Sequence, residues 1–286
     1  MNDIIQVLAC GLLMGLVYAL IALGLTLIWG VVEIVNFSHG DFMMVAMYLV
    51  FTLYSFLHLD PLFSLPLVAV AMALIGIMVH KLLIRPVLKA PMLAQIFVTF
   101  GLMIFLRGLA QFIWGPNYKV IPNVLISGSA MIGPIYLGWP QLMAGLGAVL
   151  GTIGVIWFVH RTETGRGLRA TAEDRETAGL MGIDPERMFA WTWAIGIGSL
   201  GIAGALLANF FYIFPEVGGV FGLIAFVTVA LGGFGSVGGA FAAGIIIGLV
   251  QVLSGFFINP AIKDIPVYSI YLLIVILRPQ GLLGKF

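Results

Sequence analysis

Long apolar runs with very few charges dominate this sequence and restrict what it can fold into. Hydrophobic residues make up 62% of its 286 positions. Charged residues make up only 9%, whereas a soluble domain usually contains about 25%. A water-soluble fold of this length cannot bury so much apolar surface, because chain length limits the fraction of surface that folding removes from water. The sequence therefore predicts an integral membrane protein.

Nine apolar segments are candidates for membrane-spanning helices, each of which needs about 20 residues. They are 5–29, 42–57, 62–84, 92–113, 141–160, 188–211, 219–232, 240–258 and 266–278. The seventh and ninth are short, so eight and nine crossings both stay open. Strands of a membrane barrel would instead alternate polar and apolar residues over about ten positions. We therefore expect an all-α, polytopic fold with a single transmembrane domain over residues 1–286.

Lysine and arginine gather in three hydrophilic regions, and such residues are enriched in the cytoplasmic loops of membrane proteins. The regions hold Lys81, Arg85 and Lys89; the arginines of 161–187; and Arg278 with Lys285. The order of the apolar segments allows all three to lie in the cytoplasm. Nine crossings then put the N-terminus in the periplasm, and eight allow it in the cytoplasm.

Several classes of function are disfavoured by what the sequence lacks. A net charge of +1 gives no reason to expect nucleic acid as a partner. The single cysteine, Cys10, cannot form an internal disulfide or a cysteine-based metal site. No G-x-x-x-x-G-K-[ST], G-x-S-x-G or H-E-x-x-H motif occurs. We therefore expect a chain that is not an enzyme and that binds neither a metal nor a cofactor.

A polar segment from Glu33 to Asp41 joins the first two apolar runs and is the first candidate site. Ser38 and Asp41 have the spacing of a capping box, which predicts a helix start near Ser38. The positive end of such a helix can hold a carboxylate or a polar solute. Two interpretations stay open: a turn at the membrane interface, or a lining of the translocation path by Asn36, Ser38, His39 and Asp41. His39 is not expected to bind a metal, because no second ligand is spaced to join it.

The longest hydrophilic stretch is the loop 161–187, and it is the second candidate site. Thr171 and Asp174 have the spacing of another capping box, which predicts a helix of about two turns that ends near Gly179 or Gly182. A short helix between two spans, on the cytoplasmic side, favours a docking surface over a merely solvated basic loop. The residues assigned to this coupling role are Arg169, Glu173, Asp174, Arg175, Gly179 and Gly182.

Three further patterns carry structural predictions. Asp184 before Pro185 predicts the start of the next membrane helix. The glycine-rich run 231–239 predicts a tight turn between packed helices and not a dinucleotide-binding loop, because no acidic residue follows about twenty positions later. Ala240, Gly244 and Gly248 then repeat at four-residue spacing, which predicts a small-residue packing face. Arg107, inside an apolar run, is expected to snorkel to the outer interface.

Four stretches of the chain carry a resemblance to a known family. They are NFSHGDFMM (36–44), RATAEDRETAGLMGI (169–183), GGFGSVGGA (232–240) and RPQGLLG (278–284). Together they resemble the permease subunits of bacterial branched-chain amino acid ABC importers, the LivH-like group, and the match covers nearly the whole chain. The resemblance implies a fold like that of other type II importer permeases, in the bacterial inner membrane. Urea permeases look similar, so these stretches do not specify the solute.

The resemblance also implies a division of labour among subunits. The implied partners are a second, homologous permease chain, two ATPase subunits that use the ATP, and a periplasmic solute-binding protein. The loop around 169–183 would dock on an ATPase. The implied function is the movement of branched-chain or related amino acids across the inner membrane by alternating access, with urea or another small polar solute as the alternative.

The sequence disfavours two functions from other classes. A stand-alone secondary transporter usually shows coupling carboxylates inside its helices, whereas the acidic residues here cluster at the ends of the apolar runs and in loops. An intramembrane enzyme that uses His39 and Asp41 lacks an evident third catalytic group. The sequence therefore favours the importer permease.

Overall fold

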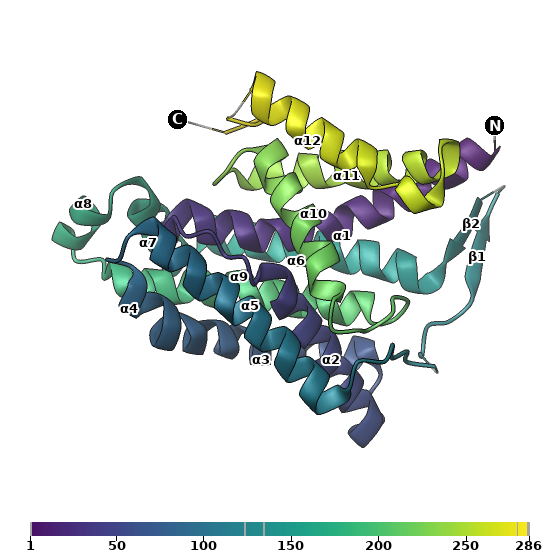
Figure 1. Ribbon diagram of the computed structural model, residues 1–286, viewed down its shortest axis with the longest axis horizontal. Helices are drawn as coiled ribbons and strands as arrows, with labels where there is room; N and C mark the ends of the chain where they lie inside the picture. The colour runs from purple at the N-terminus through teal and green to yellow at the C-terminus, as the bar shows by residue number, and fades with distance from the viewer. Residues whose placement is uncertain (1, 123, 134, 279, 285–286) are drawn as a thin grey trace.

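Long apolar helices form the body of the protein (Figure 1). The computed structural model describes residues 2–122, 124–133, 135–278 and 280–284. Within these residues, eight helical segments are long and apolar enough to cross a membrane. Their principal helices are α1 (Asn2–Val32), α2 (His39–Leu57), α3 (Pro61–Val79), α5 (Met92–Trp114), α6 (Trp139–Arg161), α9 (Pro185–Leu207), α11 (Val237–Phe257) and α12 (Ile265–Leu277). The predicted all-α, polytopic fold is confirmed.

Helix α10 (Val217–Gly232) is apolar but has only 16 residues. At 1.5 Å per residue it is about 24 Å long, less than the roughly 30 Å of a bilayer core. It runs crosswise to the long helices (Figure 1) and packs against α1, α2, α11 and α12. The eight or nine expected crossings thus correspond, in the described part of the chain, to eight long helices and one short one.

Shorter elements connect the long helices. They are a π-helical turn η1 (His80–Ile84), α4 (Arg85–Val87), α7 (Glu163–Glu173), α8 (Arg175–Leu180), a 3₁₀ turn η2 (Pro260–Ile262) and two strands, β1 (Ser129–Ile132) and β2 (Ile135–Gly138). The strands pair antiparallel, with Ser129 opposite Gly138. This hairpin was not expected from the sequence, because it is short and lies in a stretch with little alternation.

The three basic regions lie together at one end of the bundle, which we call the basic end. An ion pair of 3.0 Å between Arg85 and Glu186 joins the first region to the second. Arg169 and Leu283 line the same cavity, which brings the second region to the third. The start of α1 lies at the opposite end, where Gln6 accepts a hydrogen bond from the Tyr136 amide. This arrangement agrees with a common cytoplasmic location for the basic regions.

Helix α1 runs through the middle of the bundle, with α6, α9, α10 and α11 packed around it (Figure 1). It approaches α11 closely because small residues face each other. A Cβ atom on Gly244 would lie 2.6 Å from the Cα of Ala19, so a larger residue would push the helices apart. Ala240, Gly244 and Gly248 are all buried in the packing face that their spacing predicts.

The run 231–239 forms the tight turn expected between α10 and α11. Gly233 and Gly235 have φ angles of +100° and +77°, which residues with a Cβ rarely adopt. The segment after α12 closes over this turn. The Leu282 amide donates to the Leu231 carbonyl at 2.8 Å, and the Leu283 amide donates to the Gly232 carbonyl at 3.0 Å.

Candidate functional site

Helix α2 begins beside the middle of α1 and not beside its end. The His39 Nε2 atom lies 3.0 Å from the carbonyl oxygen of Ile21. At 1.5 Å per residue, Ile21 is about 16 Å of helix away from the end of α1 at Val32. Residues 33–38 therefore run back into the bundle from the basic end. This re-entrant segment, as we call residues 33–38, brings the start of α2 to mid-membrane depth.

Helix α10 begins at the same place. A Cβ atom on Gly218 would lie 2.7 Å from the Cα of Asp41, and one on Gly40 would lie 2.6 Å from the amide nitrogen of Gly222. The first turns of α2 and α10 can touch only because these positions carry no side chain. Both helices are discontinuous in the sense that they begin inside the membrane and not at its surface. Their first amide groups lie near mid-membrane, where such helix ends can bind anionic groups.

The four residues predicted for the translocation path lie together at this junction. Asn36, Ser38 and His39 are fully buried, and Asp41 is 1% exposed. Two polar atoms, Asn36 Nδ2 and His39 Nδ1, are buried without a partner among the described residues. Since buried polar atoms are nearly always hydrogen-bonded, this pair indicates a place for water or solute.

The predicted capping box at Ser38 is wrong, although α2 does begin next to it. The Ser38 side chain caps no amide group of α2. Its hydroxyl instead donates to Asn36 Oδ1 at 2.7 Å, because the re-entrant segment holds that acceptor beside it. Spacing alone does not show this competing acceptor.

Arg107 does not snorkel to the interface, which corrects the sequence-based expectation. Its Nε atom donates to Asp41 Oδ1 at 2.6 Å, and its Nη2 atom lies 3.4 Å from Oδ2. The Asp41 side chain is 1% exposed and the Arg107 side chain 29%. A charge inside a membrane is costly, so a two-point pairing with a buried carboxylate is the more stable arrangement.

The pair continues into a hydrophilic strip on the outer surface of the chain. Gln111, on the turn of α5 after Arg107, donates to Glu216 Oε1 at 3.0 Å. Gln111 and Glu216 are both exposed, while Phe105 and Phe112 on other faces of α5 are 62% and 88% exposed. Contact with lipid is favourable for the two phenylalanines but unfavourable for the polar and charged groups of the strip. Polar and charged groups at this depth require a water-filled space or a covering protein.

The second candidate site, in the loop 161–187, folds into α7 and α8. The predicted capping box at Thr171 is wrong, because Thr171 lies inside α7, where its hydroxyl donates to the Gly167 carbonyl. Asp174 is the N-cap of α8 and accepts from the amides of Glu176 and Thr177. The chain breaks between α7 and α8 at Asp174, whose extended backbone is typical of an N-cap.

The other end of α8 agrees with the prediction. Gly182 has a φ of +83°, its amide bonds to the Gly179 carbonyl, and the Ile183 amide bonds to the Ala178 carbonyl. This is a Schellman end, which favours glycine at the left-handed position. Asp184 caps α9 through the amides of Glu186 and Arg187, with Pro185 in the first turn, as expected.

Hydrogen bonds from the Thr177 hydroxyl, then from the Thr177 and Glu176 amides, hold the pKa of Asp174 below its usual value. The charged carboxylate is the form that caps α8. Its stabilising effect is therefore complete above the ordinary aspartate pKa and is lost as the pH falls through the lowered value.

Two apolar residues at the tip of α8 were missed from the sequence. Leu180 is 88% exposed and Met181 is 78% exposed. The available signal was an apolar pair between two glycines in a loop that is otherwise hydrophilic. Exposed apolar side chains on a projecting helix are typical of a protein–protein contact. Arg169 and Glu173 lie apart from this tip and line the cavity between α7 and the start of α11.

Arg175 connects the two candidate sites. Its Nη2 atom donates to the Val32 carbonyl at 3.1 Å and to Glu33 Oε2 at 2.9 Å. Glu33 has a φ of +60°, which is uncommon for a residue other than glycine. The first residue of α8 thus holds the end of α1 and the beginning of the re-entrant segment.

Comparison with known proteins agrees with this architecture. The family model for the permease component of branched-chain amino acid transport systems matches residues 7–277. The chain is 29% identical to the high-affinity branched-chain amino acid transport system permease protein BraD of Pseudomonas aeruginosa, over 98% of this chain and 96% of that protein. It is 28% identical to LivH of Escherichia coli, over 96% of this chain and 94% of that protein. No solved structure matches.

We predict that Arg107→Leu lowers the free energy of unfolding by about 3–5 kcal/mol, because it leaves the Asp41 carboxylate buried without a partner. Adding Asp41→Asn to this variant should recover much of the loss. Unfolding of the purified chain in mixed micelles measures both effects. Arg161→Leu, at an exposed arginine, is the matched control and should change stability little. Strictly additive effects of the two substitutions would contradict the coupling.

Proposed function

Because this chain belongs to the family of permease components of branched-chain amino acid transport systems, we propose that it forms the translocation path of an ATP-driven importer for branched-chain or related amino acids. A permease component is a transport subunit and not an enzyme. The chain is a multi-pass membrane protein, and we place it in a bacterial inner membrane with its basic end in the cytoplasm. The observation that carries the proposal is the meeting of two discontinuous helices at a buried polar junction.

The charges at this junction support an amino acid as the solute. A zwitterion needs a positive group for its carboxylate and a negative group for its ammonium. The helix starts of α2 and α10 can serve the first, and Glu216 can serve the second. Urea is neutral, so its binding does not require separate positive and negative groups. The relatives BraD and LivH are named as branched-chain amino acid permeases, which supports branched-chain amino acids in particular.

The stand-alone secondary transporter is less well supported than the importer. Asp41 is the buried carboxylate at the junction, but a guanidinium already neutralises it. A carboxylate held in this way is poorly placed to bind and release a coupling proton or sodium ion. The hydrophilic strip of Arg107, Gln111 and Glu216 instead favours a path between this chain and a second, homologous permease chain.

Alternating access follows from the Arg175 contact in this proposal. One of the two ATPase subunits binds α8 at Leu180 and Met181, the other binds the second permease chain, and a periplasmic binding protein delivers the solute at the opposite end. Movement of α8 pulls on Val32 and Glu33 through Arg175. The re-entrant segment then shifts and opens the closed junction at Asn36 and His39. Helices in contact through glycine can slide with little steric resistance, which suits such rocking.

We expect the chain with its cognate partners, in proteoliposomes, to accumulate leucine when ATP is supplied. Glu216→Gln should lower this uptake about tenfold or more, because it removes a charged partner of the solute ammonium. Glu163→Gln, at an exposed acid in α7, is the control. The chain alone should neither hydrolyse ATP nor accumulate leucine. Uptake by the chain alone, driven by an ion gradient, would instead establish the secondary transporter.

The tip of α8 supplies a second prediction. Leu180→Asp with Met181→Asp should weaken co-purification of the ATPase subunits at least about tenfold, because exposed apolar anchors often carry a large share of binding energy. Leu125→Asp, at a leucine that is 64% exposed near the opposite end of the bundle, should leave co-purification unchanged. Undiminished binding in the α8 double variant would exclude this tip as the contact.

The Arg175 contact supplies a third prediction. In a chain with Cys10→Ser, a cysteine at Asn36 should resist water-soluble thiol reagents at rest, because Asn36 is fully buried. ATP added to the assembled importer should make it reactive. Arg175→Glu should abolish this response while ATP hydrolysis continues, and combining it with Glu33→Arg should restore the response by reversing the pair. A response that survives Arg175→Glu would show that the signal travels elsewhere.

A further inference from the structure

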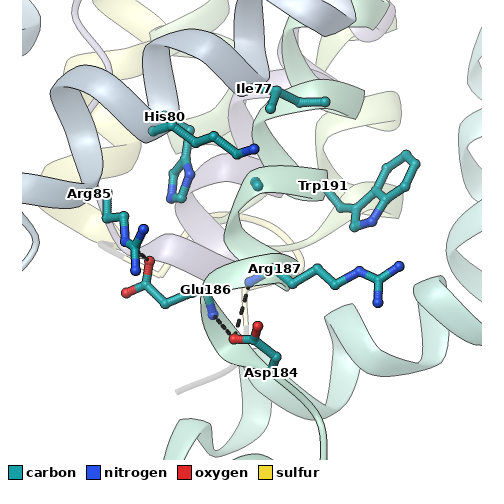
Figure 2. Close-up of a pocket in the computed structure, with 9 residues that line it drawn as sticks. Ile77, His80, Arg85, Asp184, Glu186, Arg187 and Trp191 are labelled. Carbon is teal, nitrogen blue, oxygen red and sulfur yellow. Dashed lines mark hydrogen bonds and ion pairs between the residues drawn. The ribbon is translucent and has the colours of Figure 1, made fainter.

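A cavity of about 410 Å³ lies at the basic end of the bundle, away from the junction and from the tip of α8. Figure 2 shows that its walls come from the end of α3 with η1 on one side and the start of α9 on the other. Asp184, Glu186 and Arg187 contribute to it, and so do His80 and Trp191. None of the functions proposed above uses this cavity.

His80 is the anomaly in this cavity. Its side chain is 1% exposed, and both ring nitrogens are buried without a partner among the described residues. It opens the π-helical turn His80–Ile84, and such turns often occur at functional sites because they redirect side chains. An imidazole that lacks hydrogen bonds on both nitrogens is costly, which indicates a ligand or bound water in the cavity.

The charges around His80 leave an excess of positive charge. Arg85 and Glu186 form an ion pair of 3.0 Å. Asp184 is occupied as the cap of α9. Lys81 and Arg187 are exposed and form no ion pair within the described ranges. The cavity therefore suits an anion that can accept hydrogen bonds from two cations and the imidazole.

An apolar groove of about 430 Å³ adjoins this cavity, and Trp191 lines both. The groove runs between α3, α6 and α9. Its small lining residues include Ala69, Ala73, Gly151, Gly154, Ala194 and Gly198. A smooth apolar channel at membrane depth, beside a basic cavity at the interface, has the shape and chemistry of a phospholipid. Trp191 sits at the boundary, where tryptophan is common in membrane proteins.

We propose that this composite site binds an anionic phospholipid of the cytoplasmic leaflet. Lys81 and Arg187 bind the headgroup phosphate, and His80 donates a hydrogen bond to it. One acyl chain lies in the groove along α6. Basic cavities between membrane helices on the cytoplasmic side are suited to such headgroups. A free phosphate ion would leave the groove unused, and a soluble protein partner would have to enter the lipid phase to fill it. The second permease chain is assigned to the strip of Arg107, Gln111 and Glu216 and not to this groove.

The test uses the full chain in nanodiscs that contain brominated phosphatidylglycerol or brominated phosphatidylcholine. Bromine quenches nearby tryptophan fluorescence, and subtracting the Trp191→Phe variant isolates Trp191. We expect phosphatidylglycerol to associate at least about fivefold more strongly than phosphatidylcholine. The attraction between an anionic lipid and a single cation near the membrane surface is enough to give that ratio. Lys81→Gln with Arg187→Gln should bring the ratio close to one. Gly154→Leu, whose side chain enters open space, should fill the groove and reduce quenching by both lipids.

Four results would overturn the proposal. The first is an equal affinity for the two lipids. The second is an equal loss of selectivity in the control Lys89→Gln with Arg161→Gln, which removes cations of the same end outside the cavity and would indicate general surface attraction. The third is loss of selectivity with inorganic phosphate but not with chloride at the same ionic strength, which would identify a soluble anion. The fourth is loss of lipid quenching when the ATPase subunits bind, which would make the cavity a protein interface.

Discussion

A helix that starts in the middle of a membrane leaves its first amide groups without partners in the helix, and lipid offers no acceptors. The protein meets this requirement twice, at the starts of α2 and α10, where the amides of His39, Asp41, Val217 and Gly219 each donate to the carbonyl three residues earlier. The two starts lie against each other. Glycines at 40 and 218 allow the contact, and the pair between Asp41 and Arg107 neutralises the charge inside it. The junction must therefore be enclosed on all sides by protein or water. The central position of α1 and the crosswise course of α10 provide most of that enclosure (Figure 1).

Much of this architecture could be predicted from the sequence, since spanning helices and their orientation depend on local composition. The apolar runs gave the helices, and Asp184, Pro185 and Gly182 marked helix ends correctly because those signals act within a few residues. The capping boxes at Ser38 and Thr171 failed for a related reason. A hydroxyl bonds whichever acceptor the fold places nearest, namely Asn36 in one case and the Gly167 carbonyl in the other.

The long-range partners could not be derived in this way. Asp41 and Arg107 stand on helices far apart in the sequence, and either residue alone is consistent with an interfacial position. The same holds for Glu33 and Arg175, which join a helix end to a loop far along the chain. The exposed pair Leu180 and Met181 was visible as an apolar interruption, yet only the fold shows that it projects and is not buried. The functional part of the molecule thus lies mainly in contacts that sequence patterns do not encode locally.

The closure of the turn after α10 has a consequence for how the protein is made. The last carbonyl groups of α10 receive hydrogen bonds from residues 282 and 283, which follow α12 in the chain. Biosynthesis produces α10 well before it produces these residues. The short helix must therefore wait in the membrane with an unsealed end while α11 and α12 are inserted. The two hydrogen bonds that close the end of α10 can form only after residues 282 and 283 have been made, so this closure is among the last contacts that the chain completes.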